Sequence, residues 1–201
     1  MNKTKRNNES PKPKKNNVCA IRLPSEKSLP QSIKSIFKKC KEKIGFVPNV
    51  LRAYTLRQNK FEYFRSYNNE LMLGESGLSK LDREIIAVVV SSANHCNYCL
   101  VAHGAAVRHL SGDAKLGDDL ASNYREAKLN KRQKLMSDFA WKLTTRPHEV
   151  HDADRSSLRM AGFNDKDIFD IVEVTGFYNM SNRIASGLSI KPNDEYYDIG
   201  R

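Results

Sequence analysis

Two cysteines and a histidine lie close together in the segment NHCNYCLVAHG, residues 94–104, of a chain that has four cysteines and five histidines. If the segment is helical, Cys96, Cys99 and His103 fall at positions i, i+3 and i+7 and project from one face. Cysteines with this spacing can close a disulfide with little backbone movement, and a nearby imidazole lowers the pKa of a thiol. The same three side chains are also of the types that bind zinc. The segment therefore predicts a redox-active dithiol or part of a metal site.

Glu84 precedes Cys96 by twelve positions, at the edge of the apolar run IIAVVVSSA. If the two segments form a helical hairpin, its carboxylate could face His103, fix the imidazole tautomer and pass a proton between solvent and thiol. Periodicity alone favours the other interpretation, an ordinary exposed acid in the first turn of a helix, where the helix dipole stabilises it. The role of Glu84 thus depends on how the helices pack.

Apolar residues recur at intervals of three and four from Gln31 onward, and strand-like alternation is nearly absent. This pattern predicts an all-α fold. The first helix carries its apolar stripe at Ile33, Ile36, Phe37, Cys40 and Ile44, with Gly45 after its end. The predicted helices cover residues 31–44, either one bent helix or two helices within 46–73, and then 80–93, 95–110, 114–126, 131–144, 151–161 and 165–187.

The two helices that position the candidate residues have recognisable ends. Ser79 followed by Asp82 is a capping-type start, and it favours a helix over 80–93 despite the β-branched centre. A buried strand is the competing interpretation. Asn94 is predicted to cap the next helix, which Ser111 and Gly112 close. Both cysteines then lie in the first turns of that helix.

Composition limits the class of protein. The chain has 201 residues and a net charge of +11, of which the first 17 residues supply six Lys or Arg and one Glu. We predict a disordered basic tail over 1–17 and a single all-helical domain over 18–201. No apolar run is long enough to cross a membrane and no signal peptide is apparent, so a cytoplasmic location without a membrane partner is expected. No nucleic-acid-binding motif follows the tail, so nucleic acid is not an expected partner.

An internal duplication is a further hypothesis. The segments GLSKLDREIIAVVVSSANHCNYC and GFNDKDIFDIVEVTGFYNMSNRI share a Gly-apolar-polar start, a charged first turn, an apolar helix and an Asn-rich end. The second segment has no cysteines. A degenerate repeat would explain the likeness, and one loose match alone does not establish it.

The segment from Glu84 through "IIAVVVSSANHCNYCLVAHGAAV" resembles the signature of the AhpD-like superfamily, which is related to carboxymuconolactone decarboxylase: a Glu, then CxxC, then a His four residues after the second cysteine. "GFVPNVLRAY", "LMLGESGLS" and "NMSNRIASGL" resemble its branch of uncharacterised peroxidase-related enzymes. The resemblance runs from about Gly45 to the C-terminus. It implies an AhpD-like helical bundle, assembly into dimers, trimers or hexamers, and thiol-dependent alkylhydroperoxidase activity through a reversible Cys96–Cys99 disulfide.

The resemblance also implies roles for individual residues. Glu84 and His103 match the proton relay, Cys99 matches the cysteine that attacks peroxide, and Cys96 matches the resolving cysteine. Physical reasoning alone gives the opposite order, because Cys96 is nearer the helix start and is expected to be the more acidic and exposed thiol. Tyr98 stands where the best-known members have a second histidine, and its usual pKa of about 10 makes it a poor base. His95 cannot be assumed to replace that histidine.

The implied partners are a hydroperoxide substrate and a dithiol reductant of lipoyl, thioredoxin-like or small-molecule type, with no cofactor and no metal. Three alternatives stay open. The first is a zinc site with His95 or a distant fourth ligand. The second is a cofactor-free decarboxylase or lactone-processing enzyme that uses His103 and Glu84. The third is a non-catalytic redox sensor whose basic tail binds a partner.

Other polar residues carry weaker signals. His148 and His151 are interpreted as loop or helix-start residues, and Cys19 is interpreted as incidental. Asn179, Asn182 and Arg183 could line a pocket, or could equally be polar residues that pack between helices.

Overall fold

The computed structural model describes residues 18–201, and every regular element in that range is helical, which confirms the all-α prediction. The predicted disordered tail over 1–17 lies outside the described residues. The elements are η1 Glu26–Ser28, α1 Gln31–Ile44, α2 Asn49–Tyr54, α3 Gln58–Leu73, α4 Lys80–Ala93, α5 Asn97–Ser111, α6 Leu116–Asn123, α7 Lys131–Thr145, η2 Pro147–Glu149, α8 Asp152–Met160, α9 Asp165–Gly187 and η3 Asp194–Tyr197.

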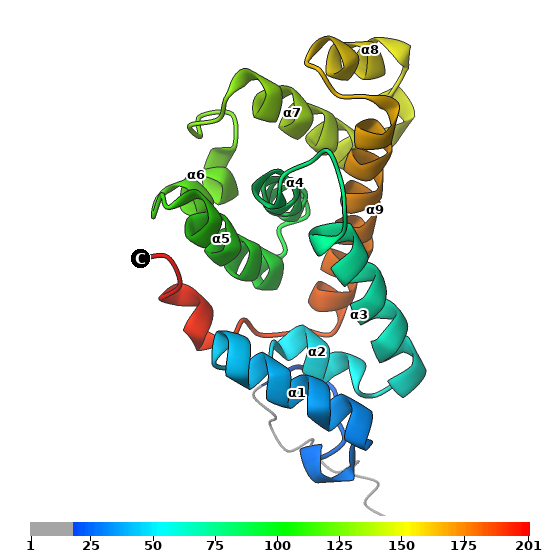
Figure 1. The fold of residues 1–201 in the computed structure, drawn as a ribbon, viewed down its shortest axis with the longest axis vertical. Helices are drawn as coiled ribbons and strands as arrows, with labels where there is room; N and C mark the ends of the chain where they lie inside the picture. The colour runs from blue at the N-terminus through cyan, green and yellow to red at the C-terminus, as the bar shows by residue number, and fades with distance from the viewer. Residues whose placement is uncertain (1–17) are drawn as a thin grey trace, which may run out of the picture.

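Helix α4 is the centre of the molecule. It begins with the predicted capping box between Ser79 and Asp82, and residues 85–91 are completely buried. Helices α5, α6, α7 and α9 all pack against it, and Figure 1 shows it nearly end-on inside this ring. Each buried Val or Ile side chain here contributes about 1.5–3 kcal/mol. Burial on every face therefore maintains a helix whose β-branched residues also suit a strand.

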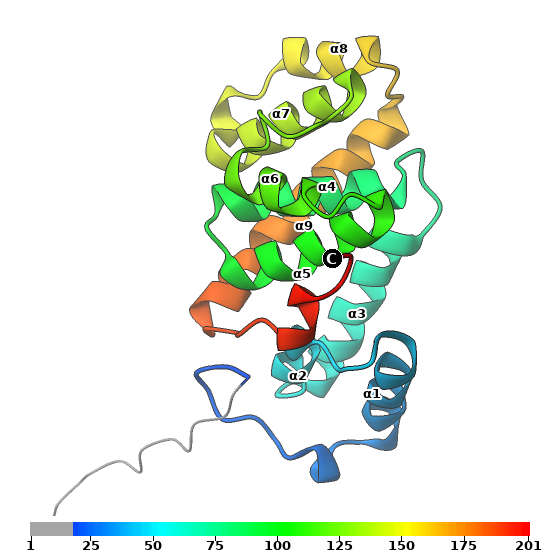
Figure 2. The ribbon, with the colours of Figure 1, turned by 90° about the vertical axis from the view of Figure 1, so that its left-hand side faces the viewer.

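Helix α9 runs along the bundle and carries several buried polar side chains. Asn164 caps it through the backbone N–H groups of Lys166 and Asp167. Figure 2 shows it crossing behind α4 and α5. Its inward face includes Tyr178, Ser181 and Asn182, and these reach the region where α4 ends and α5 begins.

Helices α1 and α2 form a separate layer at one end of the bundle (Figure 2). Ile33 and Phe37 are buried here against Phe61 of α3, and Gly45 ends α1 in the left-handed conformation, as expected. The apolar stripe predicted for α1 was wrong at the C-terminal end of the helix, because Ile44 is 47 % exposed. Cys40, predicted to lie in the core, is only partly buried.

Several predicted boundaries were also wrong. The helix predicted over 95–110 begins at Asn97, because His95 adopts a positive φ of 52° and breaks the chain direction. Asn94 ends α4 rather than capping α5. Residues 114–126 form a shorter helix, Leu116–Asn123. Of the two alternatives for residues 46–73, the pair of helices is confirmed.

The start of the described chain packs against the segment that follows α9, and this segment in turn packs against α2. The N–H of Lys191 donates to the carbonyl of Val18 at 2.9 Å, and the N–H of Ala20 donates to Leu188 at 2.8 Å. Asn193 accepts from the N–H of Asn49 at 2.8 Å. These bonds hold the segment after α9 against the start of α2.

No helix in the described range is long and apolar enough to cross a membrane. A single domain over 18–201 and an internal duplication stay predictions. The two segments compared for the duplication fold differently at their ends, since the first breaks at His95 and the second continues within α9.

Candidate active site

Glu84 and His103 form a direct pair between α4 and α5. The Oε2 atom of Glu84 lies 2.6 Å from Nδ1 of His103, and their side chains are 16 % and 20 % exposed. The ring of His103 also meets that of Tyr178 edge to face, with centroids 4.5 Å apart. The carboxylate thus fixes the orientation of the imidazole through Nδ1.

The two cysteines occupy different backbone environments. Cys96 is the N-cap of α5 with extended dihedral angles, whereas Cys99 is the third residue of the helix. After the turn at His95, the N–H of Cys96 donates to the carbonyl of Ser91 at 2.9 Å. This bond ties the start of α5 to the last turn of α4. The prediction that both cysteines lie on the helix was therefore wrong for Cys96. Its side chain lies at the N-terminus of α5, where the helix dipole favours a negative charge.

A buried amide network holds this turn in place. Asn182, 1 % exposed, donates from Nδ2 to the hydroxyl of Ser91 and accepts from Nδ2 of Asn94, both at 3.0 Å. The same Asn94 amide donates to Oδ1 of Asn179 at 3.0 Å, and Asn179 in turn donates to the hydroxyl of Thr144. Asn179 and Asn182 therefore pack between helices and position the turn that carries Cys96.

The thiols of Cys96 and Cys99 are both only 1 % exposed and are not linked in a disulfide. A hydrogen bond from the Cys99 thiol lowers the pKa of Cys96 to about 6 against the opposing effect of burial, with further help from the Cys99 backbone N–H and the Ser186 hydroxyl. The same thiol pair raises the pKa of Cys99, and burial raises it further. Cys96 is thus the more acidic thiol, as physical reasoning from the sequence suggested, but it is not exposed.

A pocket of about 260 Å³ brings the reactive groups together. Glu84, Cys99 and His103 line it, and Cys96 does not. The thiol with the lowered pKa, Cys96, is therefore not the one that reaches the pocket, which is Cys99.

The pocket walls come from distant parts of the chain, and sequence reasoning missed most of these residues. Arg65 and Asn68 come from α3, Tyr178 and Ser181 from α9, and Tyr196 from η3. Their distance in sequence from the CxxC segment leaves no local pattern that would identify them. The segment NMSNRI directs attention to α9, but to its packing residues rather than to Tyr178.

Tyr98 is buried beside the dithiol and does not act as a base. Its hydroxyl accepts a hydrogen bond from the N–H of Val50 at 3.1 Å. Burial raises the pKa of Tyr98 well above its usual value, and the nearby Tyr196 adds to the effect. His95 is exposed and does not line the pocket.

The remaining candidates lie elsewhere or contribute packing. Among residues 18–201, no three His, Cys, Asp or Glu side chains are grouped as metal ligands. His148 and His151 are exposed near the start of α8, where His151 pairs with Asp154 at 2.7 Å. Cys19 packs in the same apolar cluster as Cys96 and Cys99, so it contributes to the core around the dithiol.

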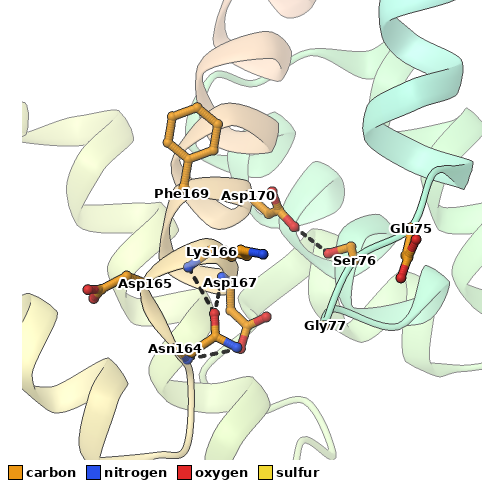
Figure 3. A pocket seen from close by; sticks show the side chains of 9 residues that line it. All are labelled: Glu75, Ser76, Gly77, Asn164, Asp165, Lys166, Asp167, Phe169 and Asp170. Atoms are coloured by element: carbon orange, nitrogen blue, oxygen red, sulfur yellow. Dashed lines mark hydrogen bonds between the residues drawn. The ribbon is translucent and has the colours of Figure 1, made fainter.

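A second hollow lies away from this pocket. It measures about 840 Å³, lies between the α3–α4 connection and the start of α9, and is shown in Figure 3. Its wall is acidic, and Ser76 donates a hydrogen bond there to Asp170. None of the predicted site residues lies in it.

The structure is an all-helical bundle that holds a CxxC dithiol next to a Glu–His pair. Comparison with known proteins shows which family has this arrangement. Residues 60–115 match the carboxymuconolactone decarboxylase family. An uncharacterized peroxidase-related protein from Silicibacter sp. TM1040 is 54 % identical, covers 94 % of this chain and 99 % of its own, and superposes with a TM-score of 0.90. The chain belongs to the AhpD-like group of this family, which confirms the resemblance seen in the sequence.

Two further structures extend the comparison. An uncharacterized peroxidase-related protein from Ralstonia eutropha JMP134, described as an alkylhydroperoxidase AhpD core, is 40 % identical with a TM-score of 0.89, covering 92 % of this chain and 97 % of its own. The debrominase Bmp8 shares the fold alone, at 14 % identity and a TM-score of 0.73 over 87 % of this chain and 92 % of its own. No curated protein matches the chain.

Proposed function

We propose that this chain is a thiol-dependent alkylhydroperoxidase in which Cys99 attacks the peroxide, Cys96 resolves the product, and Glu84 with His103 moves the proton. One observation carries the proposal. Cys99 lines the same pocket as the Glu84–His103 pair, whose nearest atoms are 2.6 Å apart, whereas Cys96 does not line the pocket and is hydrogen-bonded to Cys99. Similarity to proteins described as peroxidase-related supports the same reaction.

The first step moves a proton between the sulfurs. The resting charge lies on Cys96, whose pKa is about 6, and the Cys99 thiol donates to it. Transfer of that proton to Cys96 gives the Cys99 thiolate, which attacks the terminal oxygen of the hydroperoxide. An S–O bond forms, the O–O bond breaks and an alkoxide leaves. His103, held by Glu84, donates a proton to the alkoxide and so releases the alcohol.

The second step closes the disulfide. Cys96 attacks the sulfur of the Cys99 sulfenic acid, and the departing hydroxide takes the Cys96 proton and leaves as water. The sum is two thiols and one hydroperoxide converted to one disulfide, one alcohol and one water. An external dithiol then reduces the disulfide by thiolate exchange. A lipoyl group, a thioredoxin-like protein or a small thiol all have the required chemistry.

Anaerobic reaction of the reduced protein with one equivalent of cumene hydroperoxide tests the proposal. Mass spectrometry should find one intramolecular link between Cys96 and Cys99. Cys96→Ser should instead accumulate a sulfenic acid on Cys99 that dimedone traps, and Cys99→Ser should form neither product. Cys40→Ser, altered on α1 outside the pocket, serves as the matched control and should behave as the unaltered chain does. Full retention of both thiols in the unaltered chain would refute the proposal.

Turnover separates an enzyme from a redox sensor. With excess dihydrolipoamide, the enzyme consumes many equivalents of cumene hydroperoxide, whereas a sensor forms one disulfide and stops. Activity on an organic acid that survives replacement of both cysteines but is lost in His103→Ala would instead favour the decarboxylase alternative.

Assembly into a homo-oligomer is part of the same proposal. Phe169, Val172 and Met180 are exposed apolar residues on α9. Such residues are commonly covered in dimers and larger assemblies. Light scattering coupled to gel filtration checks this prediction, and a mass of one chain at micromolar concentration would contradict it.

A further inference from the structure

The hydroxyl of Tyr178 is a buried polar group without a partner. Tyr178 is 1 % exposed, and its hydroxyl is one of only four buried side-chain polar atoms in the described range that make no hydrogen bond. Its ring is fixed from two sides, edge to face against His103 at 4.5 Å and against Phe177 at 5.3 Å. A phenylalanine would pack equally well there, so packing alone does not account for the hydroxyl.

Tyr178 is one of the residues that line the reactive pocket, together with Cys99, His103 and Glu84. Burial and the nearby groups, of which Glu84 and Cys99 are the foremost, raise its pKa well above the usual value. The phenol therefore keeps its proton throughout the range in which the thiols titrate, and it can act only as a hydrogen-bond donor or a neutral acceptor.

An unpaired buried hydroxyl costs about 1–3 kcal/mol, so such a group on a residue that lines a reactive pocket calls for an acceptor that arrives later. The oxygen that departs from the Cys99-bound peroxide is such an acceptor, since it becomes negatively charged as the O–O bond breaks. We propose that the Tyr178 hydroxyl donates a hydrogen bond to this leaving oxygen and so makes Tyr178 a further catalytic residue. The inference rests on the proposed peroxidase function.

The chemistry balances without any change in Tyr178 itself. The Cys99 thiolate supplies the electron pair for the new S–O bond, the O–O bond breaks heterolytically, and the alkoxide carries the charge away. Tyr178 stabilises that charge through its O–H and retains its proton, and His103 then delivers the proton that yields the alcohol. A preorganised donor aimed at a developing oxyanion typically accelerates such a step by about 100-fold.

Leaving-group dependence distinguishes this role from a structural one. The tert-butoxide leaving group is a strong base and gains much from a hydrogen bond, whereas the acetate that leaves from peracetic acid is already stable. Tyr178→Phe should therefore slow disulfide formation with tert-butyl hydroperoxide by about 100-fold and with peracetic acid by only a few-fold. A structural defect would slow both reactions by the same factor.

Tyr124 provides a matched control. It is also 1 % exposed, but its hydroxyl donates to Asp138 at 2.8 Å, outside the reactive pocket. Tyr124→Phe should lower the thermal midpoint and leave both peroxide reactions unchanged. Tyr178→Phe should keep or raise the thermal midpoint, because it removes an unsatisfied group, while it loses the reaction with tert-butyl hydroperoxide.

Stopped-flow measurement of thiol loss in the full chain gives the rate of disulfide formation for each variant with each oxidant. The proposal is overturned if Tyr178→Phe reacts with tert-butyl hydroperoxide at the unaltered rate, or if both oxidants slow equally. In either case the proposed function stands, provided that the unaltered chain forms the Cys96–Cys99 link. If the unaltered chain forms no link with either oxidant, the proposed function and this inference both fail.

Discussion

The titration of Cys96 is the most direct test of how the turn at the start of α5 works. An ordinary thiol has a pKa of about 8.5 and is roughly 3 % ionised at pH 7. With its pKa lowered to about 6, Cys96 is expected to be roughly 90 % thiolate at pH 7. The hydrogen bond from the Cys99 thiol is the foremost cause, and the Cys99 backbone N–H, the Ser186 hydroxyl and His103 add to it against burial.

Ultraviolet absorbance of the reduced protein near 240 nm measures this charge. One thiolate per chain should appear with a midpoint near pH 6. Because the two sulfurs are coupled, the midpoint belongs to the pair. The folded state binds fewer protons than the unfolded state between the two pKa values. The free energy of unfolding should therefore rise with pH from about 6 to 8.5, and this stabilisation is lost as the pH falls through 6.

Three variants show which cysteine gives the absorbance change near pH 6. Cys96→Ser should abolish this change. Cys99→Ala should move its midpoint upward toward that of an ordinary thiol, because the principal hydrogen-bond donor is gone. Cys40→Ser should leave it unchanged. Absence of any thiolate below pH 8 would refute the reasoning. A step that survived Cys96→Ser and vanished in Cys99→Ala would reverse the order of acidity.

Four further substitutions test the packing in and around the site. Asn182→Ala removes a buried amide with partners on both sides and should lower the free energy of unfolding in urea by about 3 kcal/mol; an unchanged urea midpoint would contradict this. Gly117→Ala would place a Cβ 2.4 Å from the carbonyl oxygen of Gly104, so it should destabilise by about 2 kcal/mol in thermal denaturation. Gly176→Ala, which meets nothing within 4 Å, should not lower the thermal midpoint. Tyr98→Phe leaves a backbone N–H of α2 without its acceptor and should cost about 1–2 kcal/mol in urea unfolding, whereas full stability would show that water replaces the hydroxyl.

Helices with clear end signals were predicted well from the sequence. Residues 165–187 form one helix with the predicted bounds, because Asn164 caps it and Asp167 completes a capping box. Residues 80–93 form a helix for a similar reason, since Ser79 and Asp82 cap each other's backbone. In both cases the information is local, within one turn of the helix end.

The turn before α5 was predicted incorrectly for a physical reason. Asparagine is a good N-cap, so Asn94 was the natural choice. The chain instead turns at His95 with a φ of 52°, an uncommon conformation for a non-glycine residue that tertiary contacts stabilise here. Those contacts come from Asn182, far along the sequence, so no local pattern announces them.

In the candidate site, too, residues close in sequence could be predicted and residues from distant parts of the chain could not. Glu84 and His103 lie on consecutive helices, so a hairpin brings them together and their pairing could be anticipated. Tyr178, Tyr196 and Arg65 reach the pocket from three other parts of the chain, and only the packed bundle reveals them.

The way the pocket is assembled has a consequence for biosynthesis. The wall that Tyr196 provides comes about a hundred residues after Cys99 in the chain, and Arg108 secures it by donating to the Tyr196 carbonyl at 2.9 Å. At ribosomal speeds of about 5–20 residues per second, the nascent dithiol waits roughly 5–20 seconds for this wall. During that interval the sulfurs are open to oxidants and to other thiols in the cell. A newly made chain therefore depends on its surroundings to stay reduced until the bundle closes.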